Sequence, residues 1–435
     1  MLRRSAWLGV WLLCVAPGCL EEGYSVKGDA PPGEAVTFYR DVEPLLQSKC
    51  QGCHVTGGAA PFPLVSYDEV RAQSAGIAAA VEARVMPPWP PSRRGVPLLH
   101  DRSLSDAQVA TVRAWVEQGA PEGSRSEHRE RSADLARIRS DLLLQMPEPY
   151  TPSAAEAHGA AGHVHDDFRC FALGSPLPEA RFVTGYELRP GVAAMMHHAV
   201  LYVVPAPLLG QLQALDAADP APGYRCMGGP GVEEGGASGA RVLGSWKPGQ
   251  GASPLPAGTG IRVAAGEQLV LQAHYTLLNG VAPDLSTVAL ELSSGGVQEA
   301  FVYTLRNNQF LIPAGASEHP VEQHEPLLRE RTLYSVFPHM HFLGAAVSVT
   351  LRRREGTQLL LVDIPHWDFD WQGSYELATP LRLSRGDALI LRCVFDNSAA
   401  HQPRVNGAVG PPRDVGWGDG TLDEMCLSHL YFTEP

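Results

Sequence analysis

The chain of 435 residues lacks the features of several common protein classes. Basic residues are outnumbered, 34 Lys and Arg against 47 Asp and Glu. The net charge of −13, without any basic stripe, argues against a nucleic-acid partner. After the N-terminal leader, no apolar run is long enough to span a bilayer. No segment repeats with a fixed period.

What the chain does contain favours several globular domains rich in β-structure. Its 44% apolar content supplies enough core, and 37 prolines with 44 glycines indicate many loops. From Phe182 onward, short β-type runs such as 199–204 and 268–277 alternate with Gly/Pro turns, the pattern of β-sandwiches. The charged stretch 125–139 is predicted to be a partly helical connector with a solvated face.

The N-terminus has the pattern of an export signal. Two arginines precede an apolar segment over residues 6–15, and a short exit motif follows it. The apolar segment is too short to span a membrane. Gly18 before Cys19 is typical of a lipobox and predicts cleavage there, with lipid attached to the Cys19 thiol. Ala16 is weaker than Leu at the lipobox start, so ordinary cleavage is the alternative. We expect a bacterial lipoprotein that faces the periplasm or cell surface, with residues 20–35 as its tether.

The string CQGCH over residues 50–54 is the attachment motif of c-type haem. Cys50 and Cys53 would form the thioethers, and His54 would be an axial iron ligand. A CxxC pair alone also fits a redox pair or half a zinc site, but CxxCH in an exported chain is more specific. Predicted helices over 37–48 and 105–118 flank the motif and indicate a small all-α, cytochrome c-like domain.

The sixth ligand of the haem iron is predicted to be Met86, which lies in the proline-flanked loop ARVMPPWPP. A methionine opposite a histidine raises the reduction potential. His100 is the alternative ligand, and it also fits an ordinary surface histidine.

Four cysteines remain outside the leader and the haem motif: Cys170, Cys226, Cys393 and Cys426. An even number in an oxidising compartment predicts two disulfides. Four cysteines allow three connectivities, and the spacing alone does not choose among them.

Two candidate metal sites come from four strings in the C-terminal region. They are MMHHAVLYV with His197 and His198, LQAHYTL with His274, FPHMHFLG with His339 and His341, and GTLDEMC with Met425. Three imidazoles suit Cu(II), whereas two imidazoles with a thioether favour Cu(I), the state that reacts with dioxygen. The sequence therefore predicts two copper ions with different roles.

The spacing within these strings restricts the local structure. On a strand, His339 and His341 would point to the same face and could chelate one ion. Adjacent His197 and His198 would face opposite ways, so they need a bulge or a strand end to converge. His274 alone fits a hydrogen-bonded structural histidine, but four such strings together indicate metal binding.

With these ligands in this order, the chain from about Phe168 to its C-terminus resembles the copper type II, ascorbate-dependent monooxygenases, the family of peptidylglycine alpha-hydroxylating monooxygenase and dopamine beta-hydroxylase. The resemblance implies two jelly-roll-like β-sandwiches that each contribute one copper site to the cleft between them. It also implies C–H hydroxylation: the copper at His339, His341 and Met425 binds O2, and the copper at His197, His198 and His274 relays the second electron.

The resemblance further suggests the disulfides Cys170–Cys226 and Cys393–Cys426, the second of which would fix Met425 in position. The relatives draw electrons from ascorbate, whereas this chain carries its own haem motif. We therefore expect the haem to feed the histidine-only copper, and a soluble reductant or periplasmic cytochrome to recharge the haem.

The expected domains follow from these assignments. They are a signal peptide over 1–19, a tether over 20–35, a cytochrome c-like domain over 36–123, a charged connector over 124–165, and two sandwiches over 166–295 and 296–435.

The substrate is predicted only by exclusion. In the peptide-amidating relatives, an Arg before the HxH motif and an Asn and a Tyr after the ligand Met hold the substrate carboxylate. The matching residues here are Phe337, Leu427 and His429, without a guanidinium to bind a carboxylate. A small apolar or aromatic substrate is therefore expected, with His429 as a polar contact or a structural histidine. The alternatives are an electron-transfer or copper-handling lipoprotein without hydroxylase activity, and a structural lipoprotein, which the six intact ligands argue against.

Overall fold

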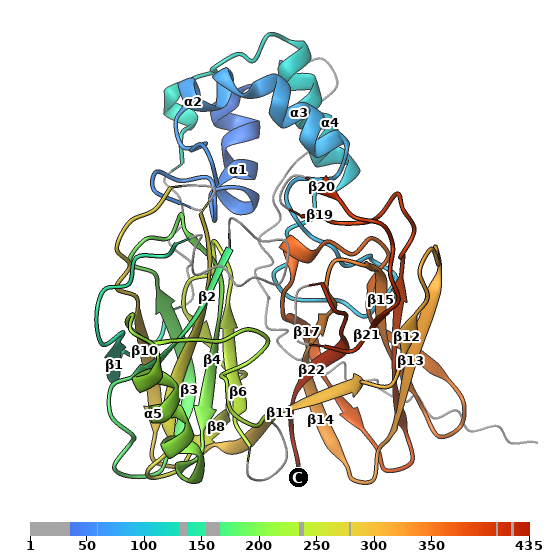
Figure 1. Cartoon of the computed structure of the whole chain (residues 1–435). Coiled ribbons are helices and arrows are strands. Elements are labelled where there is room, and N and C mark those ends of the chain that lie inside the picture. Colours follow the sequence, from blue (N-terminus) through green and yellow to red (C-terminus); the bar gives the residue numbers. More distant parts are fainter. Residues whose placement is uncertain are drawn as a thin grey trace, which may run out of the picture.

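The computed structural model describes residues 35–58, 60–129, 137–153, 166–234, 239–277, 280–405, 408–418 and 422–435. The expected signal peptide, Cys19 and all but the last residue of the expected tether lie outside them. Two β-sandwiches stand side by side, and a helical unit covers one end of the pair (Figure 1). Within the described ranges, no helix is long and apolar enough to cross a bilayer.

The helical unit has its own core. A π-helical turn at Phe38–Val42 leads into α1 (Glu43–Lys49), followed by α2 (Tyr67–Ala72), α3 (Ser74–Glu82) and α4 (Asp106–Glu117). Ser66 and Ser105 each form a capping box, which starts α2 and α4. Phe38 and Trp115 are fully buried at the centre. The predicted helices over 37–48 and 105–118 are therefore present, and the cytochrome c-like character of the unit stays a prediction.

The first sandwich packs a five-stranded sheet against part of a larger sheet. The smaller sheet has the order β5-β2-β9-β4-β6, formed by β2 (Asp166–Leu173), β4 (Met196–Val204), β5 (Tyr224–Arg225), β6 (Arg241–Trp246) and β9 (Gln268–Thr276). The facing strands are β1 (Leu142–Gln145), β3 (Arg181–Arg189), β8 (Thr259–Val263) and β10 (Thr287–Ser293), and the short β7 (Ser253–Pro254) pairs with β3.

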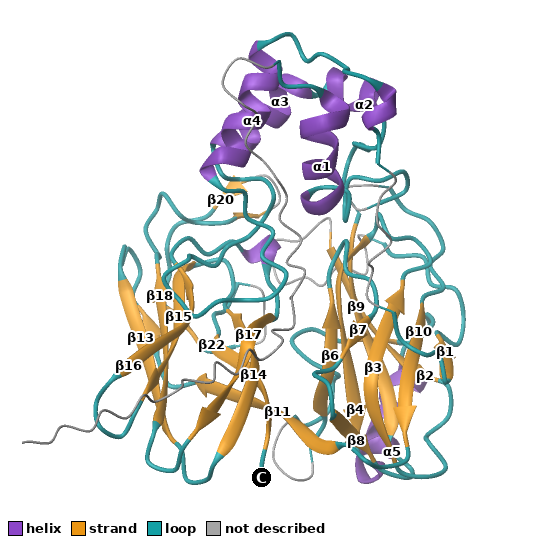
Figure 2. Ribbon diagram, turned by 180° about the vertical axis from the view of Figure 1, so that it is seen from behind, coloured by secondary structure: helices purple, strands orange, loops and turns teal. Residues whose placement is uncertain are grey.

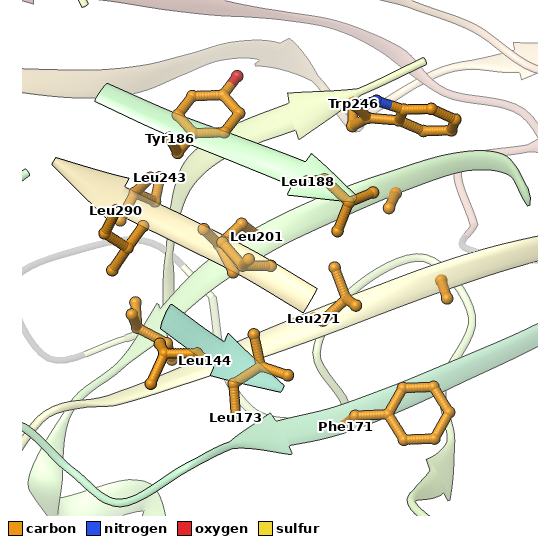
Figure 3. Close-up of a cluster of buried hydrophobic side chains, with 14 of the residues drawn as sticks. Leu144, Phe171, Leu173, Tyr186, Leu188, Leu201, Leu243, Trp246, Leu271 and Leu290 are labelled. Atoms are coloured by element: carbon orange, nitrogen blue, oxygen red, sulfur yellow. The ribbon is translucent and has the colours of Figure 1, made fainter. Parts of the chain in front are cut away.

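Side chains of both sheets meet in the core of this sandwich, which is shown in Figure 3. On β4, Leu201 and Val203 point into that core, while Tyr202 and Val204 join a second cluster under α5 (Leu209–Ala218). The alternation is that of a strand covered on both faces.

The second sandwich is built in the same way. One layer contains β11 (Gln298–Asn307), β22 (Cys426–Thr433), β14 (Arg331–His339) and β17 (Tyr375–Leu383). The other contains β13 (His319–Pro326), β18 (Ala388–Phe395), β15 (Gly344–Arg352) and β16 (Gln358–Ile364). Two short pairs complete it: β12 (Leu311–Ile312) with β21 (Val415–Gly416), and β19 (Arg404–Val405) with β20 (Ala408–Val409). The predicted β-sandwich architecture is confirmed.

One sheet runs through both sandwiches, which the sequence did not predict. β11 pairs in parallel with β8 of the first sandwich and antiparallel with β22 of the second, so nine strands form a continuous sheet. β11 crosses between the sandwiches at the end opposite the helical unit (Figures 1 and 2). The Thr259 and Tyr431 hydroxyls, 2.8 Å apart, add a buried hydrogen bond at this crossing.

Part of the expected connector belongs to the first sandwich. The described portion contains a 3-10 turn at Arg125–Glu127 and then strand β1, which pairs with β10. Tyr150 continues the pairing as a bridge to Asp284. The run of three leucines at 142–144 explains the strand, because Leu144 enters the sandwich core.

Residues 87–99, here called the strap, fasten the helical unit to the second sandwich. The backbone N–H of Val96 donates a hydrogen bond to the Leu360 carbonyl at 2.9 Å. The Pro97 carbonyl accepts one from the backbone N–H of Ala378, also at 2.9 Å. The Arg94 guanidinium binds the Asp363 carboxylate at 2.7 Å. Trp89, Val96 and Leu98 also pack against the core of the second sandwich. Removal of the helical unit with its strap would therefore expose part of that core.

Both disulfides are formed in the pairing that the family resemblance suggested. Cys170 is bonded to Cys226, and Cys393 is bonded to Cys426. The first joins β2 to the residue after β5, and the second joins β18 to the first residue of β22, next to Met425.

Candidate metal centres

The first histidine cluster converges on one point. His197 and His198 lie at the start of β4, and His274 lies on the neighbouring β9. The β4–β9 register shifts between Met196 and His198, so this irregularity turns both adjacent rings toward His274. The three Nδ1 atoms form a triangle with 3.2 Å sides. Each could lie about 2 Å from a shared ion, the usual metal–imidazole distance.

The outer nitrogens of this cluster are held by carboxylates. His274 Nε2 donates to Asp166 Oδ1 at 3.0 Å, and His197 Nε2 lies 3.7 Å from Asp370 Oδ1 of the second sandwich. The Phe168 ring stacks on His274 with centroids 4.0 Å apart. A proton on Nε2 leaves the Nδ1 lone pair free for a metal.

Burial keeps these rings in the uncharged form that binds metals. Desolvation, followed by the imidazoles of His274, His197 and His339, lowers the pKa of His198 well below its ordinary value. Desolvation also lowers the pKa of His197, although Asp370 opposes that shift. A neutral imidazole needs no deprotonation before it binds a cation.

The second cluster uses the opposite ring nitrogens. His339 Nδ1 bonds to the side-chain oxygen of Gln372, and His341 Nδ1 donates to the Asp423 carbonyl at 3.0 Å. Nδ1 is therefore the nitrogen that a protein oxygen holds in each of these two rings. Burial lowers the pKa of His339, which favours the neutral ring. The cluster sits at the end of β14 rather than within a strand, since His339 is the last strand residue and His341 lies in the following turn.

Met425 reaches this cluster through the sheet register. β14 and β22 pair antiparallel with His339 opposite Leu427. The pairing stops there, so His341 lies just beyond the end of β14 and Met425 lies just before the start of β22, at the same end of the strand pair. Met425 is buried and lines the same cavity as both histidines.

Glu424 ties these ligand segments together. One of its carboxylate oxygens accepts the backbone N–H of His341 at 2.9 Å and of Met425 at 3.2 Å, and the other accepts that of Leu343 at 2.6 Å. Burial raises the pKa of Glu424 to about 8, although these hydrogen bonds oppose the shift. Glu424, which directly precedes Met425 in the string GTLDEMC, therefore supports the turn that carries His341.

A single cavity of about 2940 Å³ contains both clusters and the CxxCH motif. Its lining residues come from the helical unit and from both sandwiches, and Figure 2 shows how these three parts are arranged. Asp370 of the second sandwich reaches His197 of the first, so the two clusters face one another across this space.

The CxxCH motif has the donors that a covalent haem needs. Cys50 and Cys53 carry free thiols, and burial raises the pKa of Cys50 to about 12. His54 Nδ1 donates to the Phe62 carbonyl at 2.9 Å, which leaves Nε2 for an iron. The surrounding cavity wall includes Ile77 and Val81 and is largely apolar. These residues fit a haem.

Both candidate sixth ligands line this part of the cavity. The side chain of His100 is 82% exposed and lies 4.0 Å from Glu376, whereas Met86 is partly buried. The assignment of Met86 stays a prediction.

The wall beside the second cluster is aromatic. Phe337 and His429 pack with ring centroids 5.7 Å apart, and His429 Nδ1 is 2.9 Å from the Thr304 hydroxyl. Burial lowers the pKa of His429 to about 4, so the ring is neutral. Other aromatic residues of the second sandwich that line the cavity include Phe301, Tyr303, Phe342, Phe369, Trp371, Trp417 and Tyr431.

Sequence reasoning missed the supporting residues of both clusters. Asp166, Gln372 and Asp370 contact ligand histidines, but each comes from an element distant in sequence from its partner. No motif marks them. Only the position of Glu424 between Asp423 and Met425 gave a local signal.

The fold and the clusters together define a class: a two-sandwich protein with two histidine clusters facing one cavity. Residues 321–435 match the family model described as copper type II ascorbate-dependent monooxygenase, C-terminal domain. The chain is also 24% identical over 213 residues to tyramine beta-hydroxylase of Caenorhabditis briggsae. That match covers 44% of this chain and 34% of the relative, so it spans about a third of the relative's length.

These matches relate the chain to the copper type II monooxygenases, as the sequence strings indicated. Similar solved structures include the major capsid protein P2 of bacteriophage PM2, with a TM-score of 0.29 and 10% identity over 68% of this chain and 97% of that one. The structure of PNGF-II has a TM-score of 0.26 and 11% identity, and the match covers 68% of this chain and 66% of that one. Scores this low do not identify a shared fold.

Asp166 offers a test of the first cluster. Replacing it with Ala removes the acceptor that orients His274, so Cu(II) affinity at this cluster should fall roughly 10–100-fold. Asp166→Asn keeps an oxygen acceptor, so its Cu(II) affinity should fall less than that of Asp166→Ala. Competition titrations followed by electron paramagnetic resonance measure both variants. Equal Cu(II) affinity in wild type and Asp166→Ala would show that the carboxylate does not support the site.

Glu424 offers a test of the second cluster, formed by His339, His341 and Met425. Glu424→Ala leaves three buried N–H groups without an acceptor and should lower the free energy of unfolding of the copper-free protein by about 3 kcal/mol. It should also weaken Cu(I) binding, because both ligand segments lose their shared anchor. Asp423→Asn is the matched control, since that side chain is 44% exposed. Chemical denaturation and Cu(I) competition measure the effects, and equal losses in both variants would contradict the role of Glu424.

Proposed function

We propose that this protein is a copper-dependent monooxygenase that hydroxylates a C–H bond of a small apolar or aromatic substrate with O2, and that a covalently attached haem c supplies its electrons. The observation that carries the proposal is the shared cavity, because two complementary histidine clusters and a CxxCH motif open into one space.

Two copper ions would supply one-electron storage at one cluster and O2 activation at the other. His197, His198 and His274 would hold the first ion through Nδ1, with Asp166 fixing the proton on the outer nitrogen of His274. His339 and His341 would present Nε2, and Met425 would add a thioether that favours Cu(I). Gln372 and Asp423 orient the two rings of the second site.

Cys50 and Cys53 would form the haem thioethers, with His54 and Met86 as axial ligands. The Cys53 sulfur lies 3.5 Å from the carbonyl oxygen of Pro248, just after β6. Trp246 of β6 is paired with Ala199 of β4, next to the ligand His198. This chain of contacts supports electron delivery from the haem to the histidine-only copper, one electron at a time and twice for each hydroxylation.

The aromatic wall around Phe337 supports an apolar or aromatic substrate, since the carboxylate-binding Arg of the peptide-amidating relatives is replaced by that ring. His429, neutral and bonded to Thr304, would be a polar contact. We further propose export and lipid attachment at Cys19, with a periplasmic cytochrome or soluble reductant as the electron donor.

Met425 tests the hydroxylase assignment. Met425→Ile removes the soft ligand but keeps the side-chain volume close, so the protein should retain Cu(II) at the first cluster and lose product formation. Product is measured by mass spectrometry after incubation of the reduced, copper-loaded protein with metabolite extract under 18O2. Hydroxylation by Met425→Ile would refute the O2-site assignment. If the wild-type protein incorporates no 18O into any metabolite of the extract, the result would favour an electron-transfer or copper-handling protein.

Gly249 tests the electron route. A Cβ at this position would lie 2.7 Å from the Cys53 sulfur and from the Gly52 carbonyl oxygen. Gly249→Ala should therefore separate the CxxCH motif from Pro248 and slow haem reoxidation several-fold in stopped-flow mixing of the pre-reduced protein with O2 and substrate. Gly258→Ala carries a similar left-handed backbone, with φ of +76° against +78°, but meets no atom within 4 Å, so it controls for backbone strain.

A haem that reoxidises equally fast in Gly249→Ala would exclude this contact as the route. Equally fast reoxidation in His197→Ala/His198→Ala protein would show that the haem passes its electrons elsewhere. It would refute the proposal that the haem supplies electrons for hydroxylation.

A further inference from the structure

The ammonium group of Lys247 lies deep at the junction of the helical unit and both sandwiches. Lys247 follows β6 of the first sandwich, and its Nζ lies 5.8 Å from the centre of the Tyr375 ring of the second. A Cβ at Gly373 would collide with this Nζ, so the absence of a side chain at Gly373 leaves room for the ammonium group. Lys247 also lines the cavity beside Cys53.

Arg102, from the segment that follows the strap, lines the same cavity. The electrostatic influence of both cations reaches the Cys53 thiol and lowers its pKa, although burial has the larger, opposite effect. Burial, and then the nearby charge of Arg102, lowers the pKa of Lys247 to about 8. The two cations therefore lie close enough to destabilise one another.

Within the described residues, neither cation has a polar partner. In the described part of the chain, Lys247 and Arg102 make no side-chain hydrogen bond and no ion pair. Lys49 is different, because its Nζ already donates to the Asp101 carbonyl at 2.5 Å. Both side chains are only partly exposed, and a cation that loses part of its hydration is destabilised unless a partner compensates that loss. Two such cations on one cavity wall indicate an anion that the chain itself does not provide.

We propose that Lys247 and Arg102 form a carboxylate-binding site at this junction. A carboxylate would accept charge-assisted hydrogen bonds from both side chains, and the planar guanidinium matches its two oxygens. It would also relieve the repulsion between the cations. The carboxylate has two possible sources: a propionate of the haem attached at Cys53, or a free carboxylate that enters the cavity. Only the first source rests on the proposed function.

The tethered source is tested in the haem-containing protein by redox-difference infrared spectroscopy, in which haem propionates give their own bands. Lys247→Met and Arg102→Met should each shift a propionate band, while Lys247→Arg should restore it. Lys49→Met removes a neighbouring cation that already has a partner and should leave the band unchanged. Copper content and the thermal melting curve establish that each variant is folded.

The free source is tested with succinate as the probe, by calorimetric titration of the same proteins and of Cys50→Ala/Cys53→Ala protein, which cannot attach haem. If the site takes a free carboxylate, Lys247→Met and Arg102→Met should weaken succinate binding about tenfold or more, and Lys49→Met should not. A shifted propionate band or lost succinate binding supports the site and identifies its source. No change in either measurement overturns it. A protein without haem would refute the proposed electron supply, while the succinate titration would still decide the site.

Discussion

The pairing of β11 with β8 on one side and β22 on the other is the constraint on which the functional architecture depends. Backbone hydrogen bonds allow little movement between paired strands, so the continuous sheet holds the two sandwiches at one end. At the other end, the strap binds the helical unit to β16 and β17. The cavity between these two attachments is therefore bounded by fixed elements, and the histidine clusters on β4, β9 and β14 face one another across it.

The strands also decide which ring nitrogen each histidine presents. At the first cluster, carboxylates hold the Nε2 atoms of His274 and His197 and leave Nδ1 for a metal. At the second, Gln372 and the Asp423 carbonyl hold Nδ1 and leave Nε2. The first cluster would therefore hold a metal through Nδ1 atoms, and the second would hold one from the side of its rings that faces away from Gln372 and Asp423. The difference fits an ion that stores charge and an ion that meets a substrate.

The sequence was sufficient where the chemistry is local. The bulge at His197 and His198 follows from the need of two adjacent rings to face one way, and the structure has that irregularity. The β-sandwiches followed from short apolar runs between glycines and prolines. The shared sheet was not predictable, because the pairing of residue 298 with residue 259 leaves no local pattern. Gln372 and Asp166 were missed for the same reason, since only the tertiary fold brings each to its histidine.

The charges around the cavity show a further division. Near the histidine clusters, burial favours neutral imidazoles, and the acidic partners Asp166 and Asp370 lie behind them. Near the CxxCH motif, by contrast, Lys247 and Arg102 have no acidic partner among the described residues, in a chain whose net charge is −13. A chain with 47 acidic residues has many ways to neutralise two partly buried cations, yet in the described part none of these carboxylates forms an ion pair with them. The imbalance therefore favours a bound anion over a structural role for the two cations.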